Sequence, residues 1–153
     1  MTTLDATSVT VDKKVQLIDA RGPRFGALIT TILLAIALIT NSTLLIGLQL
    51  AVFALAVAFG PARSPYGLIF KKFVKPRLSG DVPTEDARPP RFAQAVGLGF
   101  ALTAFIAGLA GASTVFSVAV AFCLAATFLN AAFNFCLGCE IYLLISRATH
   151  KAR

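Results

Sequence analysis

Charged residues are scarce in this chain of 153 residues, of which only 14% are charged and 57% are hydrophobic. Soluble domains have roughly 25% charged and roughly 45–50% apolar residues. A soluble fold would need two all-apolar helical hairpins, both buried, with no amphipathic face to cover them. The shortage of charge therefore argues against a soluble protein, and the length allows one membrane domain.

The apolar runs also lack an ionisable residue at mid-membrane depth, where transporters usually carry one. Glu140 is the only acid near a run, and it stands at the rim. The chain has no phosphate-binding loop, no paired carboxylates within a run, no Ser-His-Asp set and, with His150 as its only histidine, no haem-type histidine pair. These absences leave no familiar catalytic or transport motif.

Four apolar runs remain, and they predict an all-α membrane protein. A helix needs about 20 apolar residues to cross about 30 Å of hydrocarbon, and the first two runs are slightly short of that. The first run follows 24 residues without an apolar core, so we expect a spanning segment and no signal peptide. The predicted transmembrane helices cover residues 25–40, 44–60, 92–111 and 114–145.

Uncharged links join these runs into two hairpins, at Thr40–Thr43 and Ala110–Ser113. All 14 Lys and Arg lie in residues 13–24, 63–91 and 147–153, and neither link carries one. Because basic residues concentrate in cytoplasmic loops, both termini and the central loop are predicted to be cytoplasmic, in the plasma membrane. This topology explains the net charge of +7 without a nucleic-acid partner.

The remaining segments divide simply. We expect a disordered tail over residues 1–12, one four-helix domain over 13–147 with a cytoplasmic loop over 61–91, and a basic tail over 148–153. Within residues 66–75 of the loop, the apolar side chains can share one helical face while the basic ones stay in water. The apolar residues are Ile69, Phe70 and Phe73, and the basic ones are Lys71, Lys72 and Lys75. This pattern predicts an amphipathic helix lying in the membrane interface after the second span.

The pattern R-x-P-R-F occurs at Arg21 and again 67 residues later, at Arg88. Proline suits a helix start, and arginine suits headgroup depth. Two independent entry signals would give the same pattern, but we favour a duplicated hairpin whose copies enter from the same side. The arginines expected to orient the bundle at the interface are Arg21, Arg24, Arg63, Arg88 and Arg91.

The hairpin exits align less well. Phe59–Tyr66 matches Phe135–Tyr142 at an offset of 76 residues, from Phe59 to Phe135. This alignment sets Cys136 opposite Gly60 and Cys139 opposite Arg63. The second copy thus replaces a proline turn with two thiols and an acid, which favours a role for the cysteines.

Cys136 and Cys139 form a C-x-x-C motif, predicted to lie near the cytoplasmic boundary of the last helix. The cytosol keeps thiols reduced, so three interpretations stay open: packing cysteines, a dithiol that exchanges with a partner, or a metal site. In one continuous helix the dipole and Glu140 would raise the thiol pKa values, unless Gly138 breaks the helix. Two thiols, Glu140 and the remote His150 make a poor ligand set, so no metal or other cofactor is predicted.

The last run also carries a stripe on one helical face. We expect this stripe to face the bundle interior, on the side roughly opposite Cys136 and Cys139, and to pair with Gln49. The stripe either stabilises the packing of the helices through hydrogen bonds or, alternatively, forms a polar ligand site. Its members are Cys123, Thr127, Asn130 and Asn134.

The entry sequence from Asp19 to Phe25, the second R-x-P-R-F and the ending FCLGCEIY at residues 135–142 resemble a family of small four-helix membrane proteins, common in actinobacteria and of unknown function. The resemblance extends over residues 12–147. It implies thioredoxin-like or rhodanese-like partners, because members of the family keep company with such proteins.

Together these features predict a membrane component of cytoplasmic thiol-redox or sulfur metabolism. Cys136 and Cys139 would react, Glu140 would relay a proton, and Arg63 or other rim arginines would favour the thiolate. The alternative is a non-enzymatic accessory or assembly subunit of a larger membrane complex, with the cysteines as small residues at a helix contact.

Overall fold

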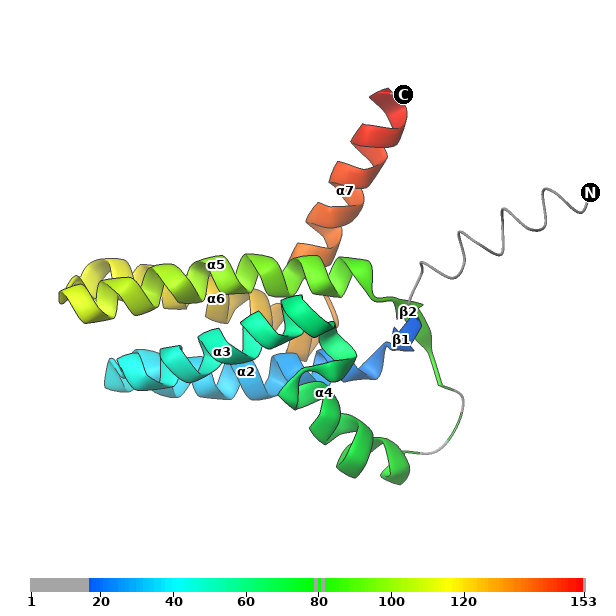
Figure 1. The fold of residues 1–153 in the computed structure, drawn as a ribbon, viewed down its shortest axis with the longest axis horizontal. Helices are drawn as coiled ribbons and strands as arrows, with labels where there is room; N and C mark the ends of the chain where they lie inside the picture. The colour runs from blue at the N-terminus through cyan, green and yellow to red at the C-terminus, as the bar shows by residue number, and fades with distance from the viewer. Residues whose placement is uncertain (1–16, 79, 81, 153) are drawn as a thin grey trace, which may run out of the picture.

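The structure is a computed structural model that describes residues 17–78, 80 and 82–152. Four long helices lie side by side along the length of the molecule (Figure 1). They are α2 (Arg21–Thr40), α3 (Thr43–Phe59), α5 (Arg88–Ala110) and α6 (Ser113–Phe133). The predicted disordered tail, residues 1–12, lies outside the described residues.

Two tight turns join these helices into hairpins, α2 with α3 and α5 with α6, and both turns lie at the same end of the bundle (Figure 1). Asn41 has φ 51° after α2, and Gly111 has φ 77° after α5. Gly and Asn tolerate this left-handed conformation, so they end helices well. Ser42 then caps α3 by accepting a hydrogen bond of 3.3 Å from the N–H of Leu45. Both turns fall at the predicted uncharged links.

The entry helices begin earlier than predicted. α2 starts at Arg21 rather than at residue 25, and α5 starts at Arg88 rather than at residue 92. The R-x-P-R segment therefore forms the first helical turn in both copies. Proline is suited to that position because its fixed φ is helical and the first turn needs no N–H donor.

Small and medium-sized side chains fill the bundle core. The fully buried side chains include Leu34, Ile46 and Val120, and alanines on α5 let its neighbours approach closely. Large apolar side chains cover the outer faces, such as Ile32 and Leu48. An apolar surface of this extent is suited to lipid. Helices α2, α5 and α6 are each long and apolar enough to cross a membrane, while α3 is a shorter apolar helix of 17 residues. The chain is an all-α membrane protein.

A short antiparallel ribbon precedes both hairpins, and the sequence did not predict it. Strand β1 (Leu17–Asp19) pairs with β2 (Thr84–Asp86), with Ile18 opposite Glu85. The ribbon lies at the end of the molecule opposite the hairpin turns (Figure 1). It ties the start of α2 to the start of α5, which are far apart in sequence.

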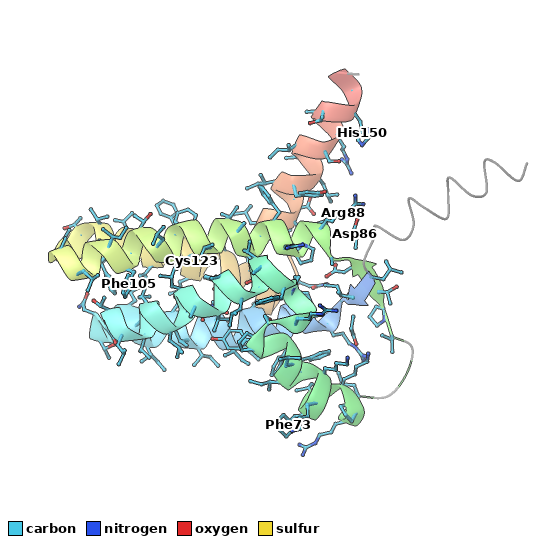
Figure 2. The ribbon with its side chains drawn as sticks, viewed as in Figure 1. Phe73, Asp86, Arg88, Phe105, Cys123 and His150 are labelled. Carbon is cyan, nitrogen blue, oxygen red and sulfur yellow. A yellow bond between two sulfur atoms is a disulfide. The ribbon has the colours of Figure 1, made fainter. Side chains whose placement is uncertain are left out.

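The segment predicted as an interfacial helix is helical. It consists of three types of helix in succession: α4 (Pro65–Ile69), the π-helical η2 (Phe70–Val74) and the 3-10 helix η3 (Lys75–Arg77). A 3-10 turn, η1 (Pro61–Arg63), connects it to α3. Phe70 is buried against Phe25, with ring centroids 5.7 Å apart. Phe73 is exposed, and Figure 2 shows it away from the bundle. A location in the membrane interface stays a prediction.

The last predicted helix, over residues 114–145, is divided in two. α6 ends at Phe133, and a separate helix, α7 (Leu137–Ala152), projects away from the bundle (Figure 1). Asn134 has φ 55°, and the N–H of Phe135 bonds to the carbonyl of Leu129 at 3.2 Å, which closes α6 in a Schellman turn. The expected basic tail, residues 148–153, is helical as far as Ala152.

The two hairpins share the same contacts at their starts. Asp19 accepts a hydrogen bond of 3.0 Å from the N–H of Arg21 and forms an ion pair of 2.8 Å with its guanidinium. Asp86 does the same with Arg88, at 2.9 and 2.6 Å (Figure 2). These contacts support duplication rather than independent entry signals, because Asp19 and Asp86, which accept them, lie outside the R-x-P-R-F pattern itself.

Candidate thiol site and cavity

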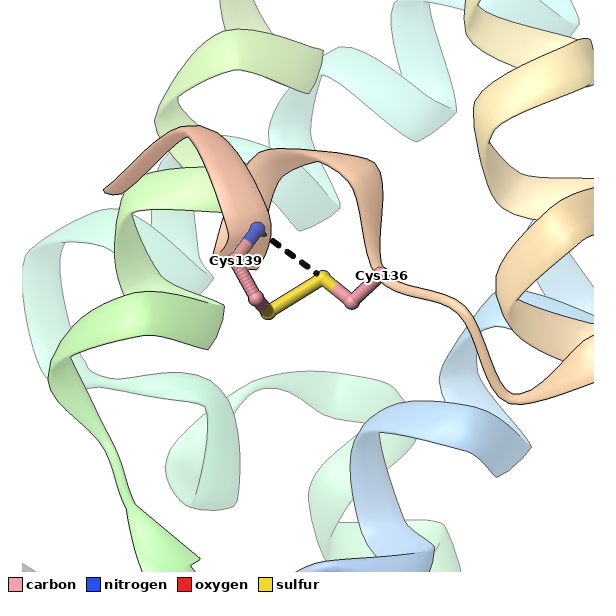
Figure 3. Close-up of a disulfide and its surroundings, with 2 residues drawn as sticks. All are labelled: Cys136 and Cys139. Carbon is pink, nitrogen blue, oxygen red and sulfur yellow. Dashed lines mark hydrogen bonds between the residues drawn. A yellow bond between two sulfur atoms is a disulfide. The ribbon is translucent and has the colours of Figure 1, made fainter. Parts of the chain in front are cut away.

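The helix break places both cysteines at the beginning of α7. Cys136 immediately precedes the helix and Cys139 lies in its first turn. They form a disulfide, with their Cα atoms 5.1 Å apart (Figure 3). The N–H of Cys139 also donates a hydrogen bond of 3.3 Å to Cys136 Sγ (Figure 3). This geometry is that of a helix N-cap in which sulfur takes the place of the usual oxygen.

The break reverses the expected effect of the helix dipole. In one continuous helix the pair would stand near a C-terminal end, which disfavours an anionic thiolate. At the start of α7 it stands at the positive end, which favours one. The break lies at Asn134–Cys136 and not at Gly138, the position considered in the sequence. Glu140 follows Cys139, is exposed, and adds a negative charge that acts against the dipole.

Gly138 has a packing role. A Cβ at this position would stand 2.6 Å from Ala93 Cβ and 2.7 Å from Ala93 Cα. One turn further along α7, the Tyr142 ring packs on the Phe92 ring with centroids 5.7 Å apart. The first turns of α7 and α5 are therefore in close contact, and this contact holds the cysteine pair against the bundle.

The structural repeat differs from the exit alignment made in the sequence. Phe59 and Phe133 end the two helices, at an offset of 74 residues and not 76. Ser64 caps α4 through a hydrogen bond of 3.2 Å from the N–H of Gly67. This is the bond that Cys136 makes with Cys139. Cys136 thus corresponds to Ser64 rather than to Gly60, because the capping geometry, and not the aromatic spacing, is what repeats.

A partly open cavity of about 250 Å³ adjoins Cys136. Its wall includes Cys136 and Gly138 from the start of α7, and Ser64 from the cap of α4. No charged side chain lines it among the described residues. Its other polar side chains are Thr30, Tyr66, Gln94, Thr127 and Asn130.

The polar stripe of the last run divides between the cavity and the helix end. Thr127 and Asn130 line the cavity, together with the buried Cys123, which Figure 2 shows within the bundle. Asn134 instead ends α6 and is exposed. Cys136, predicted on the opposite side from this stripe, shares its cavity because the chain turns after Asn134.

Gln49 is fully buried and bonds to residues of the first hairpin and α4, rather than to the stripe. Its Nε2 donates to Thr30 Oγ1 at 3.3 Å, and its Oε1 accepts from the Tyr66 hydroxyl at 2.7 Å. Tyr66, Thr30 and Gln94 were not singled out in the sequence. The signal for Gln94 was present, because it is the only amide within the apolar run 92–111.

The predicted interface arginines are mostly engaged in structural bonds. Arg24 Nε donates to the carbonyl of Ala131 at 3.1 Å, and Arg91 Nε donates to that of Val57 at 2.6 Å. Each caps the end of a helix in the other hairpin, where a cation is favoured. Arg21 and Arg88 pair with aspartates. Arg63 is exposed at the end of η1.

Two carboxyl groups beside these arginines have lowered pKa values. The hydrogen bond from Arg21 holds the pKa of Asp19 below its usual 3.8, and the bond from Arg88 does the same for the pKa of Asp86. Burial raises the pKa of Glu85 above 4.5, and the neighbouring Asp86 adds to that rise. The described residues contain no cluster of three or more His, Cys, Asp and Glu suited to a metal.

The fold and the site define a class: a small all-α membrane protein with a cysteine pair at the start of its last helix and an uncharged cavity beside it. A family model described as "Domain of unknown function (DUF4395)" matches residues 18–147. The chain belongs to this family, which confirms the resemblance to a family of unknown function. No curated protein and no solved structure matches the chain.

Proposed function

We propose that this protein is a membrane component of thiol-redox or sulfur metabolism on the cytoplasmic side of the plasma membrane. The observation that supports this function best is the disulfide-forming pair Cys136–Cys139 at the N-terminus of α7. Disulfides in the cytosol are usually transient and catalytic. The pair lies at the end of the bundle that carries the ribbon and α4, where the basic residues gather, and this is the end predicted to face the cytosol.

The two cysteines have different surroundings, which suggests different roles. Cys136 lines the cavity, whereas Cys139 is not part of its wall. A partner thiolate attacks Cys139 Sγ, the S–S bond breaks, and Cys136 leaves as a thiolate. The N–H of Cys139 and the positive end of α7 stabilise that thiolate. A second partner thiolate then resolves the mixed disulfide, so the partner is oxidised and the pair gains two electrons.

A soluble thioredoxin-like protein fits this exchange as the partner, because it supplies two thiols. A rhodanese-like partner would instead transfer sulfane sulfur and leave one additional sulfur atom on a cysteine. Glu140 is exposed and follows Cys139 in the chain. In this proposal it accepts the proton of an incoming thiol. Arg63, also exposed, is a candidate for favouring the thiolate.

Thiol trapping in native membranes tests this function. Cells are quenched in acid and labelled with a mass-tagged maleimide, with and without prior reduction. We expect Cys136 and Cys139 to shift between free thiol and disulfide or persulfide with oxidant or sulfur supply. Cys136→Ser keeps the thiol at Cys139, which should attack the disulfide of the oxidised partner, release one partner thiolate and accumulate as a mixed disulfide; Cys139→Ser should accumulate much less of this species.

Cys123→Ala is the matched control, because Cys123 is buried and outside the pair. It should leave the trapping pattern unchanged. If the pair stays reduced under every condition and neither serine variant traps a partner, the thiol function is wrong. Unaltered assembly of a double serine variant into a larger complex would then favour the accessory-subunit interpretation.

A further inference from the structure

We infer that the cavity beside Cys136 binds a lipid-soluble quinone, which accepts the two electrons of the reduced cysteine pair. This inference rests on the proposed thiol function and names the oxidant that restores the disulfide. The ligand class follows from the chemistry of the wall, from the place of the cavity in the membrane bundle and from the position of Cys136.

The wall of the cavity is suited to an uncharged, flat and largely apolar molecule. Among the residues that the structure describes, no Lys, Arg, Asp or Glu lines it, which disfavours nucleotides, phosphates and other ions as ligands. Phe53, Phe100 and Phe122 contribute aromatic surface. A volume of about 250 Å³ holds a substituted ring but not a long side chain, so the isoprenoid tail of a quinone would extend outward between helices.

The cavity also borders the lipid-facing surface. Phe100 on α5 and Phe122 on α6 line it, yet both are exposed on the outside of the bundle. Their rings stack with centroids 6.2 Å apart along the seam between these helices. A molecule dissolved in the bilayer can therefore reach the cavity without passing through water.

Hydrogen-bond donors are present for the two carbonyl oxygens of a quinone. The amides of Gln94 and Asn130 line the cavity and form no side-chain hydrogen bond within the described part of the chain. Tyr66 donates to Gln49 and is already engaged. We assign Gln94 and Asn130 as quinone-binding residues, because an amide N–H is a suitable donor to a carbonyl.

The repeat explains why one side of the cavity is reactive. Ser64 and Cys136 occupy equivalent capping positions, and both line the cavity. The first copy presents a hydroxyl, which cannot be oxidised in this way, and the second presents a thiol. In the reaction, the two S–H bonds are lost and an S–S bond forms. Two electrons and two protons pass to the quinone, whose carbonyl oxygens become the hydroxyls of a quinol.

The test uses the full-length protein in lipid nanodiscs, reduced and freed of reductant, with a short-chain ubiquinone or menaquinone analogue. Quinone absorbance and free thiols are followed together. We expect one quinol per oxidised Cys136–Cys139 pair, and none with Cys136→Ser. Ala126→Phe fills the cavity, and Asn130→Leu removes a donor; each should slow oxidation by about tenfold or more, the scale of one lost hydrogen bond.

Ala125→Phe is the matched control, because Ala125 is the exposed neighbour of Ala126 on the same helix and does not line the cavity. It should retain the parent rate. If the disulfide form of the protein is reduced by a thioredoxin-like dithiol, and the reduced form is oxidised by diamide but not by quinone, the quinone site is wrong and the thiol function stands. If it reacts with none of them, both are wrong. Equal rates for Ala126→Phe, Asn130→Leu and the parent would place the reaction outside this cavity.

Discussion

Single carboxylates anchor the start of each hairpin. Asp19 and Asp86 accept the N–H of the arginine two residues later and pair with its guanidinium, so each fixes the first turn of an entry helix. Asp19 is the last residue of β1 and Asp86 is the last residue of β2, so both belong to the ribbon that joins the hairpins. Each of these bonds joins residues only two positions apart. Because the same bond occurs at the start of both hairpins, it fixes equivalent ends of the two halves.

The ribbon should lose stability in acid through these carboxylates. The pKa values of Asp19 and Asp86 are below 3.8 when folded, mainly because of the arginine hydrogen bonds. Their contribution is therefore fully present above pH 3.8, the ordinary pKa, and is lost as the pH falls through the lowered values. Thermal unfolding in detergent micelles, measured across this range, should show the loss in the parent and a smaller one in Asp86→Asn.

Glu85 provides the control for that titration, because its pKa is shifted in the opposite direction and its effect on stability therefore has the opposite sign. Its folded pKa lies above 4.5, so its ionised form is disfavoured by folding, and stability rises as the pH falls through the raised value. Glu85→Gln should remove this rise while keeping the loss at lower pH. An acid transition that is identical in Asp86→Asn and the parent would show that the ribbon does not contribute.

At the scale of elements, α7 is the distinctive feature. Asn134 ends α6 in a left-handed conformation, and the next helix starts with a sulfur cap. The contact between α7 and α5 then fixes the direction in which α7 leaves the bundle. The position of Cys136 and Cys139 at the positive end of a helix dipole follows from this arrangement, because the same motif inside one continuous helix would stand near the negative end.

Gly138→Ala should weaken the contact between α7 and α5. The added methyl would meet the backbone and Cβ of Ala93, which cannot move aside as a flexible side chain does. We expect a loss of about 1–3 kcal/mol, typical of overpacking at a well-packed contact. Gly99→Ala is the control, because nothing lies within 4 Å of a Cβ at Gly99. It should be neutral or gain up to about 1 kcal/mol from helix propensity.

Denaturant unfolding of both variants in micelles measures this difference, and maleimide labelling of the reduced pair gives a second readout. A displaced α7 should make Cys136 react faster in Gly138→Ala than in Gly99→Ala. Equal stability and equal labelling would mean that the two helices are not in contact in the membrane.

At the scale of the whole molecule, the two hairpins hold each other. Arg24 of the first caps α6 of the second, and Arg91 of the second caps α3 of the first. The antiparallel pairing of β1 with β2 is a third contact between the two hairpins. Each hairpin therefore receives an arginine hydrogen bond at one helix end from the other hairpin, so we expect both halves to fold as one unit.

The membrane orientation should follow the charge distribution. Both hairpin turns lie at one end of the bundle, and the ribbon and α4 lie at the other (Figure 1). In a background with Cys123, Cys136 and Cys139 replaced by serine, new cysteines at Asn41 and Ala112 should react with an impermeant maleimide in intact cells. A new cysteine at Arg77 should react only after permeabilisation. Labelling with the opposite pattern would place the thiol pair outside the cytosol.

Much of this architecture is present in the sequence. The four apolar runs, the two uncharged turns and the repeated R-x-P-R-F predict the bundle and its two equivalent hairpins, because lipid requires long apolar helices and repeats preserve their entry signals. The turn at Asn134 could not be predicted with the same ease. Asparagine in an apolar run is compatible with a helix interior, and only the local bonds to Asn130 and Leu129 show that a helix ends there.

What the sequence by itself determined is an all-α membrane protein with a C-x-x-C motif at one end, since composition and apolar periodicity act locally along the chain. The tertiary structure decided which end of a helix carries the thiols, and that Cys136 shares a cavity with Thr127 and Asn130. These properties depend on the direction of α7 and on the packing that brings residues of α4, α5 and α6 into one cavity wall. Such packing joins residues distant in sequence, and no local sequence pattern encodes it.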